Sequence, residues 1–382
     1  MHQIFKKILL ENNGRSYYRV AEHLFAVECS DSALLQYMKN YEPFREPTPN
    51  PSLNAPHDAG VIGDPAKGRE LGEEIFTLRV ERHEARGERR KARGEEWTHV
   101  MTDNAEEDMP RIEVYRAIRR EGDEAREWLL RVAMVAKAPI SCEIECNEDF
   151  TQGVLYIMPD CQDIRFCIDN ALMLLFAFRT APMMTLEMHA AVVVRGSLED
   201  GAGRLQDASL SAPQKSADFS GTPLQDALTG YREEEKGDEA RGYLFLGHSG
   251  TGKSTHARQW LAAFDDAWLL NDDNPILRVM EDGEVRVYGS PWSGKTPCYK
   301  NAYARVGGIV KLSQAPHNKI RTISLPEAYA YMLSSASGMK MDRHMADCMY
   351  ESIKHVITHV KCYHLDCLPN TEAAEVAQRG MA

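Results

Sequence analysis

The chain has 382 residues, enough for two or three domains with a sizeable core, and its formal net charge of −12 argues against a general nucleic-acid-binding surface. Its nine cysteines stand at irregular spacings, which is typical of reduced cytosolic thiols and not of a disulfide framework. Residues 1–10 lack the apolar run of a secretory leader and no stretch approaches a membrane span, so we expect a cytoplasmic protein without a membrane partner.

Residues 1–180 predict a strand-rich α+β domain with loop insertions. Short apolar segments predict strands, mostly antiparallel, at 17–20, 24–27, 75–80, 111–118, 128–135, 141–146 and 154–158. Helices are expected around 32–40 and 163–180, the second as a buried helix that docks onto the next domain. The proline-rich segment 45–70 predicts a loop, and the mixed charges of 81–96 predict a solvated tip or a short exposed helix. Substrate presentation and structural support both remain open as the role of this domain.

Residues 181–382 predict a second domain, in which two apolar strands flank a long polar segment. The strands are expected at 188–193 and 242–246. Between them, residues 198–241 are rich in Ser, Gly, Asp, Gln and Glu and cannot bury much apolar surface. We therefore expect a disordered insertion between two strands that are already neighbours in a hairpin. A tolerated insertion is favoured over a recognition or regulatory segment.

Residues 247–254 fill every fixed position of the phosphate-loop pattern G-x-x-x-x-G-K-[ST]. Glycines let the backbone turn tightly and aim N–H groups at phosphate oxygens, Lys253 can reach the β and γ phosphates, and the Ser254 hydroxyl can ligate Mg²⁺. The helix expected at 255–262 directs its N-terminus at the anion. The sequence therefore predicts a site for a nucleoside triphosphate with Mg²⁺, formed by Gly247, His248, Ser249, Gly250, Thr251, Gly252, Lys253, Ser254 and Thr255.

A second acidic element follows about twenty residues after the phosphate-loop lysine. The apolar run 267–271 ends in Asp272 and Asp273. Because consecutive side chains of a strand point to opposite faces, one carboxylate can ligate Mg²⁺ while the other accepts a proton from an attacking hydroxyl. We expect both aspartates to be catalytic and place the metal on Asp272 together with Ser254. A plain Asp-Asp-Asn-Pro turn is the alternative, and both can hold at once.

The segment 288–296 is a Gly/Pro/Ser loop that carries Trp292 and Lys295. Loops on a rigid sheet often carry substrate contacts, so both residues are candidates. Trp292 could stack on a base or cover the site, and Lys295 could meet the γ phosphate or an anionic substrate. A structural turn with a surface lysine fits the same residues equally well. Further along, Arg305 is a candidate to neutralise charge in a phosphoryl-transfer transition state.

The C-terminal region invites a metal-site hypothesis, because five potential ligands lie within a short stretch, namely His355, His359, Cys362, His364 and Cys367. Their spacing matches neither the H-E-x-x-H pattern nor a zinc knuckle. Residues 360–365 alternate like an ordinary strand. We therefore favour a structural role for this region.

Three segments, in the same order, resemble the superfamily of the HPr serine kinase/phosphorylases and the ATP-dependent phosphoenolpyruvate carboxykinases. They are the strand 188–193 with His189, the loop 247–255 with the letters GHSGTGKST, and the double-aspartate strand 270–273. The resemblance covers about half the chain, from roughly residue 181 onward. It implies an α/β domain with the mixed β-sheet of P-loop kinases of this type, phosphoryl transfer from ATP with Mg²⁺, and a catalytic place for His189 beside the phosphates or a metal ion.

Two departures from the superfamily narrow the prediction. The carboxykinases carry a metal-binding lysine upstream of the histidine, whereas no lysine stands between Asp160 and His189 here, so carboxykinase activity is not expected. The Arg-Gly-rich signature of the HPr kinases is matched only in part at 305–310. We therefore predict an HPr-kinase-like phosphotransferase that moves the γ-phosphoryl group to a hydroxyl of a protein, peptide or small metabolite. An ATP-binding switch or scaffold without transfer is the alternative, and a homo-oligomer is compatible with either.

Overall fold

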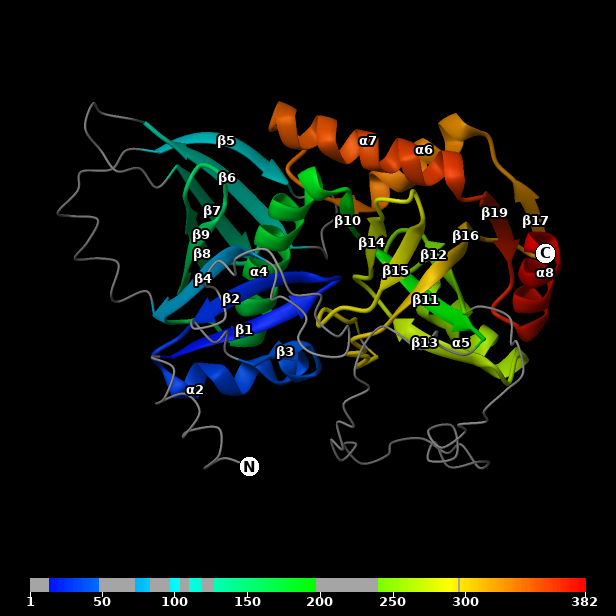
Figure 1. Cartoon of the computed structure of the whole chain (residues 1–382), viewed down its shortest axis with the longest axis horizontal. Helices are drawn as coiled ribbons and strands as arrows, with labels where there is room; N and C mark the ends of the chain where they lie inside the picture. The colour runs from blue at the N-terminus through cyan, green and yellow to red at the C-terminus, as the bar shows by residue number, and fades with distance from the viewer. Residues whose placement is uncertain are drawn as a thin grey trace, which may run out of the picture.

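The computed structural model describes residues 14–47, 73–82, 97–103, 110–118, 127–196, 240–294 and 296–382. Within these residues the chain forms two large mixed β-sheets and six α-helices, so the predicted α/β class is confirmed. Figure 1 shows the two sheets side by side, with the first built from the N-terminal part of the chain and the second from the C-terminal part.

The first sheet has nine strands in the order β3-β1-β2-β4-β9-β8-β7-β6-β5. Its strands are β1 (Arg15–Val20), β2 (His23–Glu28), β3 (Arg45–Glu46), β4 (Glu74–Arg82), β5 (Trp97–Asp103), β6 (Arg111–Ala117), β7 (Trp128–Ala133), β8 (Ile140–Cys146) and β9 (Gln152–Ile157). Every strand predicted before residue 160 is present, and the short β3 and the exposed β5 are additional. Only β4 pairs in parallel, with β2 and β9, so the sheet is mostly antiparallel as expected.

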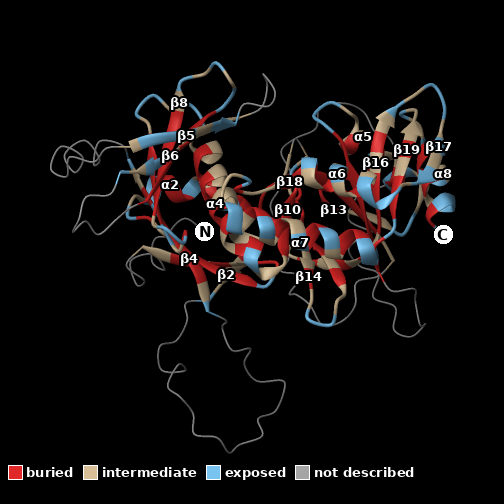
Figure 2. Cartoon of the chain, turned by 90° about the horizontal axis from the view of Figure 1, so that it is seen from above, coloured by how far each residue is buried: buried red, intermediate tan, exposed pale blue. Residues whose placement is uncertain are grey.

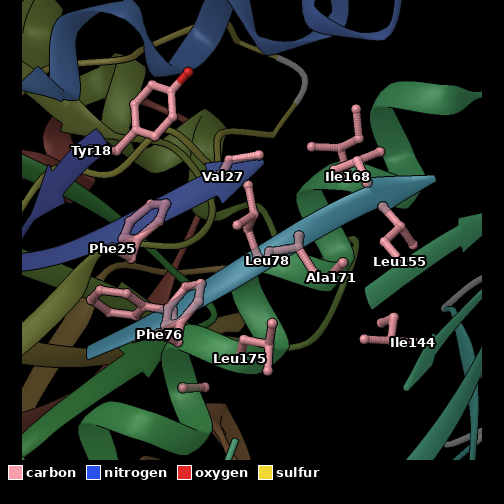
Figure 3. Close-up of a cluster of buried hydrophobic side chains, with 14 of the residues drawn as sticks. Tyr18, Phe25, Val27, Phe76, Leu78, Ile144, Leu155, Ile168, Ala171 and Leu175 are labelled. Carbon is pink, nitrogen blue, oxygen red and sulfur yellow. The ribbon is translucent and has the colours of Figure 1, made fainter. Parts of the chain in front are cut away.

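Helix α4 (Ile164–Thr180) packs against this sheet and closes its core. The carboxylate of Asp163 accepts a hydrogen bond from the Phe166 N–H at 2.9 Å and caps the helix N-terminus. Figure 3 shows the apolar side chains that meet between helix and strands, among them Phe25, Phe76, Leu78, Ile144, Leu155, Ile168, Ala171 and Leu175. Residues Ile164–Met183 are the one helical stretch of the described chain long and apolar enough to cross a membrane, and 56% of an 18-residue window within it is buried inside the protein. Its apolar character is that of a core helix.

A short helix and a 3₁₀ helix follow the first hairpin. Helix α2 (Ser32–Leu35) continues into the 3₁₀ helix η1 (Gln36–Phe44), so the helix expected around 32–40 is present but tightens after its first turn. Pro43 lies inside η1, where a regular α-helix would need its missing N–H. This segment places Asn40 and Tyr41 at the junction of the two sheets.

The second sheet has ten strands, ordered β13-β11-β12-β16-β15-β14-β10-β18, with β19 beside β16 and β17 beside β19. The strands are β10 (Thr185–Met188), β11 (Ala190–Arg195), β12 (Arg241–Leu246), β13 (Ala267–Asn271), β14 (Ile276–Val279), β15 (Val285–Tyr288), β16 (Tyr303–Gln314), β17 (Lys319–Thr322), β18 (Ala336–Ser337) and β19 (Cys362–Cys367). The pairs β12–β16 and β16–β19 are parallel and the others are antiparallel. The sheet is therefore mixed.

Helices cover both faces of the second sheet. Helices α5 (Lys253–Ala263) and α8 (Thr371–Met381) share one apolar cluster, and α6 (Leu325–Ser335) and α7 (Arg343–His359) share the other. Alternate residues of β12 enter the two clusters: Leu244 lies on the α6–α7 side and Phe245 on the α5–α8 side. Figure 2 shows buried residues running through both sheets beneath the helices.

Strands β11 and β12 form an antiparallel pair in which Arg195 lies opposite Arg241. The two strands that flank the expected insertion are therefore direct neighbours, as predicted. Residues 197–239, which hold nearly all of that insertion, lie outside the described residues, so its expected disorder stays a prediction.

Candidate functional site

The phosphate-loop motif occupies the turn between β12, which ends at Leu246, and α5, which begins at Lys253. Gly250 and Gly252 have φ angles of +77° and +107°, in the region that favours glycine. A Cβ at either position would meet no atom within 4 Å, so backbone conformation, not crowding, selects glycine there. The predicted strand–loop–helix context is therefore present.

Helix α5 directs its N-terminus at this loop. Its N-cap, Gly252, offers no side-chain hydrogen bond to the first turn, and such unsatisfied N–H groups form an anion site. From β16, Gln314 donates its Nε2–H to the carbonyl oxygens of Gly250 at 3.1 Å and Thr251 at 3.4 Å. This contact, which no sequence pattern indicates, braces the tip of the loop.

Lys253 is brought together with two residues from other elements. Its side chain is buried, and its Nζ donates to the Gly247 carbonyl at 2.9 Å and lies 3.0 Å from Nε2 of His189. The same His189 nitrogen lies 3.4 Å from Oδ1 of Asp273. The structure thus gathers three of the predicted site residues, with an imidazole between a cation and a carboxylate.

The double-aspartate turn is fixed by Asn271, which is fully buried. Its Oδ1 accepts from the backbone N–H of Asp273 at 2.8 Å and of Asn274 at 2.9 Å. Its Nδ2 donates to the Ser290 hydroxyl at 3.1 Å and to the Trp292 carbonyl at 3.0 Å. Sequence reasoning did not single out Asn271, although an Asn that begins an Asp-Asp-Asn-Pro turn is a known turn signal.

Asp272 and Asp273 face different partners, as their adjacency predicts. Asp272 is 4% exposed and its Oδ2 accepts from the Thr296 N–H at 3.3 Å, whereas Asp273 faces His189. The oxygen donors of Asp272 and Ser254 fit the ligand preference of Mg²⁺. Within the described part of the chain, no group of three or more His, Cys, Asp and Glu residues could hold a metal alone.

Glu187 is a buried carboxyl that sequence reasoning missed. It is 1% exposed on β10, two residues before His189, and neither of its carboxyl oxygens has a hydrogen-bond partner in the described structure. Burial raises the pKa of Glu187 well above its ordinary range, and the negative charge of Asp273 raises it further. The sequence signal was present, because this glutamate interrupts an otherwise apolar stretch.

Trp292 does not lie where a substrate contact needs it, and its expected role is corrected. The ring is 2% exposed, and its Nε1–H donates to the Tyr41 hydroxyl at 2.7 Å. It also meets Phe176 edge-on at 5.3 Å between ring centroids. A ring enclosed in this way has no face for a nucleotide base and does not cover the site, so the structural alternative holds. Lys295, the other candidate of this loop, lies outside the described residues.

Arg305 lies at the wrong end of the sheet for its expected catalytic role. In the parallel pair β12–β16 it is opposite Arg241, whereas Leu246, next to the phosphate loop, is opposite Lys311. Six residues of strand separate these levels, about 20 Å at the usual rise. The guanidinium of Arg305 instead forms an ion pair with Glu284. The prediction for Arg305 is therefore wrong.

The C-terminal histidines and cysteines lie on α7 and β19. His355 and His359 stack at 4.0 Å between centroids on α7, and Nε2 of His355 lies 3.2 Å from the Gly283 carbonyl. Cys362 is buried in β19. The structural role favoured for this region stays a prediction.

No protein-family model matches the chain, and no curated protein matches it. The chemistry open to this chain is therefore inferred from the geometry of the site. That geometry consists of a glycine loop at a helix N-terminus, with His189 in contact with both Lys253 and Asp273.

Proposed function

We propose that the chain is an ATP-dependent phosphotransferase with a P-loop kinase domain of the HPr kinase/carboxykinase type at residues 181–382. One observation carries the proposal: Lys253, His189 and Asp273 converge beside the glycine loop from three separate elements. The carboxylate of Asp273 beside His189 adds a group that can accept a proton, which supports transfer over binding alone. The acceptor is a hydroxyl of a protein, peptide or small metabolite.

The loop residues supply the binding part of this function. The backbone of residues 247–252 and the first turn of α5 offer N–H donors, and Lys253 adds a positive charge for the terminal phosphates. Ser254 and Asp272 would hold Mg²⁺, which supplies neutralisation of phosphate charge when bound. The buried position of Lys253 strengthens its attraction for an anion, because little water screens it.

Asp273 supplies the general base. The oxygen of the acceptor hydroxyl forms a bond to the γ-phosphorus, the bond from that phosphorus to the β–γ bridging oxygen breaks, and ADP leaves. The hydroxyl proton passes to the Asp273 carboxylate. His189, 3.4 Å from Oδ1 of Asp273, orients this carboxylate.

An ATP-binding switch is the second candidate, and one observation favours it. The backbone of the double-aspartate turn is hydrogen-bonded through Asn271 to Trp292, and Trp292 is hydrogen-bonded to Tyr41 of the first sheet region. Nucleotide occupancy at the turn could therefore be read by the N-terminal part of the chain. A switch of this kind needs binding but no transfer.

The two candidates are separated by ADP formation. The purified protein is incubated with MgATP and a fractionated cell lysate as a source of acceptors, with Asp273→Asn as the matched variant. A kinase yields ADP that depends on the lysate fraction and on Asp273. ATP that is bound but unchanged in every fraction favours the switch.

We also propose a cytoplasmic location and a division into regions 1–180 and 181–382. All nine cysteines are free thiols, which supports a reducing compartment. The first sheet uses strands between Arg15 and Ile157, and the second uses strands between Thr185 and Cys367. Each sheet is thus built from one continuous part of the sequence.

A further inference from the structure

The loop that carries Trp292 is held by the N-terminal region of the chain. The Trp292 Nε1–H donates to the Tyr41 hydroxyl at 2.7 Å, and Asn40 donates its Nδ2–H to the Pro291 carbonyl at 2.9 Å. Asn40 and Tyr41 belong to η1 and are 3% and 0% exposed. These contacts are shielded from water, so their geometry is strongly determined.

Asp169 of α4 anchors the other side of this contact. Its Oδ1 accepts from the Tyr41 hydroxyl at 2.8 Å and from Asn40 Nδ2 at 3.0 Å. Its Oδ2 accepts from Arg165 Nε at 3.2 Å. A tyrosine hydroxyl has one proton, and because Tyr41 gives it to Asp169, its lone pair is left for the Trp292 N–H. The direction of each hydrogen bond is therefore fixed.

The same chain of contacts reaches the double-aspartate turn. The Trp292 carbonyl accepts from Asn271 Nδ2 at 3.0 Å, and Asn271 Oδ1 holds the N–H groups of Asp273 and Asn274. Successive hydrogen bonds and covalent links thus join Asp169, Tyr41, Trp292, Asn271 and Asp273. We call these five residues the junction network.

We propose that the N-terminal region positions Asp273 through the junction network, with Tyr41, Trp292 and Asn271 as positioning residues. This inference rests on the proposed function, in which Asp273 is the base. A misplacement of about 1 Å at a reacting group can lower the rate about a hundredfold. A network in which these contacts are all formed would therefore serve the reaction by holding Asp273 in place. Trp292 therefore serves the site from the core instead of touching substrate.

Tyr41→Phe tests this in the full-length protein. The substitution removes the hydroxyl, keeps the ring, and leaves the Trp292 N–H without its acceptor. Tyr18→Phe is the matched control, because Tyr18 is also a buried tyrosine of this core and its ring lies edge-on to Tyr41 at 5.6 Å. Hydrogen–deuterium exchange is measured by mass spectrometry for peptides that cover 271–275 and, as an internal reference, 247–252.

The proposal expects at least about tenfold faster exchange at 271–275 in Tyr41→Phe, with no change in Tyr18→Phe and none at 247–252. Equal protection of 271–275 in Tyr41→Phe and the wild type overturns it, and so does equal loss in both variants. Trp292→Phe, which removes the same hydrogen bond from the other side, must give the same pattern. This second variant covers the case in which Tyr41→Phe does not fold.

ADP formation supplies an independent second readout. If the wild type turns over ATP, Tyr41→Phe should lower kcat about tenfold and leave ATP affinity unchanged, and a kcat equal to that of Tyr18→Phe overturns the inference. If the wild type does not turn over ATP, the proposed function fails. The exchange result still decides whether the N-terminal region fixes the turn.

Discussion

The ammonium of Lys253 lies 3.0 Å from Nε2 of His189, and this contact joins the phosphate loop to a turn 64 residues earlier in the chain. The same nitrogen faces Oδ1 of Asp273 at 3.4 Å. Nε2 can accept from Lys253 when it has no proton and can donate to Asp273 when it has one. The position of one proton on His189 therefore selects its partner. The residue links the phosphate-binding group to the proposed base.

Substitution of Lys253 tests whether the loop binds MgATP. Lys253→Ala should weaken MgATP binding roughly ten- to a hundredfold, because a buried charge-assisted hydrogen bond contributes about 1.5–3 kcal/mol. Lys311→Ala is the control, because Lys311 lies opposite Leu246 on the adjacent strand and outside the loop. Calorimetric titration measures both. Unchanged affinity in a folded Lys253→Ala protein would contradict the assignment.

The two aspartates should give different kinetic defects. Asp272→Asn should raise the Mg²⁺ concentration needed for half-maximal turnover, since its carboxylate is the proposed metal ligand. Asp273→Asn should keep nucleotide affinity and lower turnover about 10²- to 10⁴-fold, the usual contribution of a general base. Steady-state rates over a Mg²⁺ series separate the two effects. Wild-type turnover in both variants would remove the base and the metal ligand from the account and favour the switch.

His256 predicts a loss of stability in acid. It is buried on α5, its Nε2 accepts the Trp260 Nε1–H at 3.0 Å, and burial lowers its pKa to about 4. In the unfolded state His256 has a pKa near 6.5, so as the pH falls it binds a proton there before it does in the folded state. The contribution of neutral His256 to the free energy of unfolding is therefore complete above about pH 6.5 and is lost as the pH falls toward 4. The full difference is about 3 kcal/mol.

The substitution His256→Gln keeps an acceptor for Trp260 and removes the titration. Urea unfolding at pH 7, 6, 5 and 4.5 should therefore show the wild type losing stability relative to this variant as the pH falls. The buried His23 is present in both proteins, so its own titration cancels in the difference. A difference that does not depend on pH would refute the role given to His256.

Because of Glu187, we expect a stability contribution that changes with pH in the opposite direction. Its folded-state pKa is raised, so the folded protein keeps this proton to a higher pH than the unfolded chain does. The contribution of Glu187 to the free energy of unfolding is present in full below about pH 4.3. It is lost as the pH rises toward the raised folded-state pKa. Glu187→Gln should therefore be as stable as the wild type near pH 4 and increasingly more stable toward pH 8. Thermal unfolding that finds the variant less stable at pH 8 would show an unrecognised partner for the carboxylate.

Much of the fold follows from local patterns in the sequence. The strands of both sheets follow apolar alternation, and the turn between β12 and α5 follows from the positions of its glycines. Local patterns do not determine which distant strands pair. The role predicted for Arg305 was wrong because the parallel register of β12 and β16 places this residue at the end of the sheet away from the phosphate loop. The substrate contact predicted for Trp292 was wrong because this side chain is buried against Tyr41, which lies 251 residues away in the sequence.

Site residues that belong to a local sequence motif could be predicted. Residues whose role depends on their buried surroundings could not. Lys253, His189 and Asp273 were identified from motif and resemblance, and the structure brings them together. Asn271 and Glu187 were missed because their importance comes from what surrounds them. Both side-chain polar atoms of Asn271 have hydrogen-bond partners, whereas neither carboxyl oxygen of Glu187 has one within the described residues. Neither state can be inferred from the residue type alone.

A labelling experiment can follow the γ-phosphoryl group itself. Parallel reactions contain MgATP labelled at the γ or the α phosphate, the purified protein and a cell lysate, with Lys253→Ala as the matched control. We predict that the γ label moves to an acceptor with the wild type and not with the variant, and that the α label moves with neither. A wild type that binds MgATP but leaves the γ label in ATP would contradict the account and leave a nucleotide-binding switch.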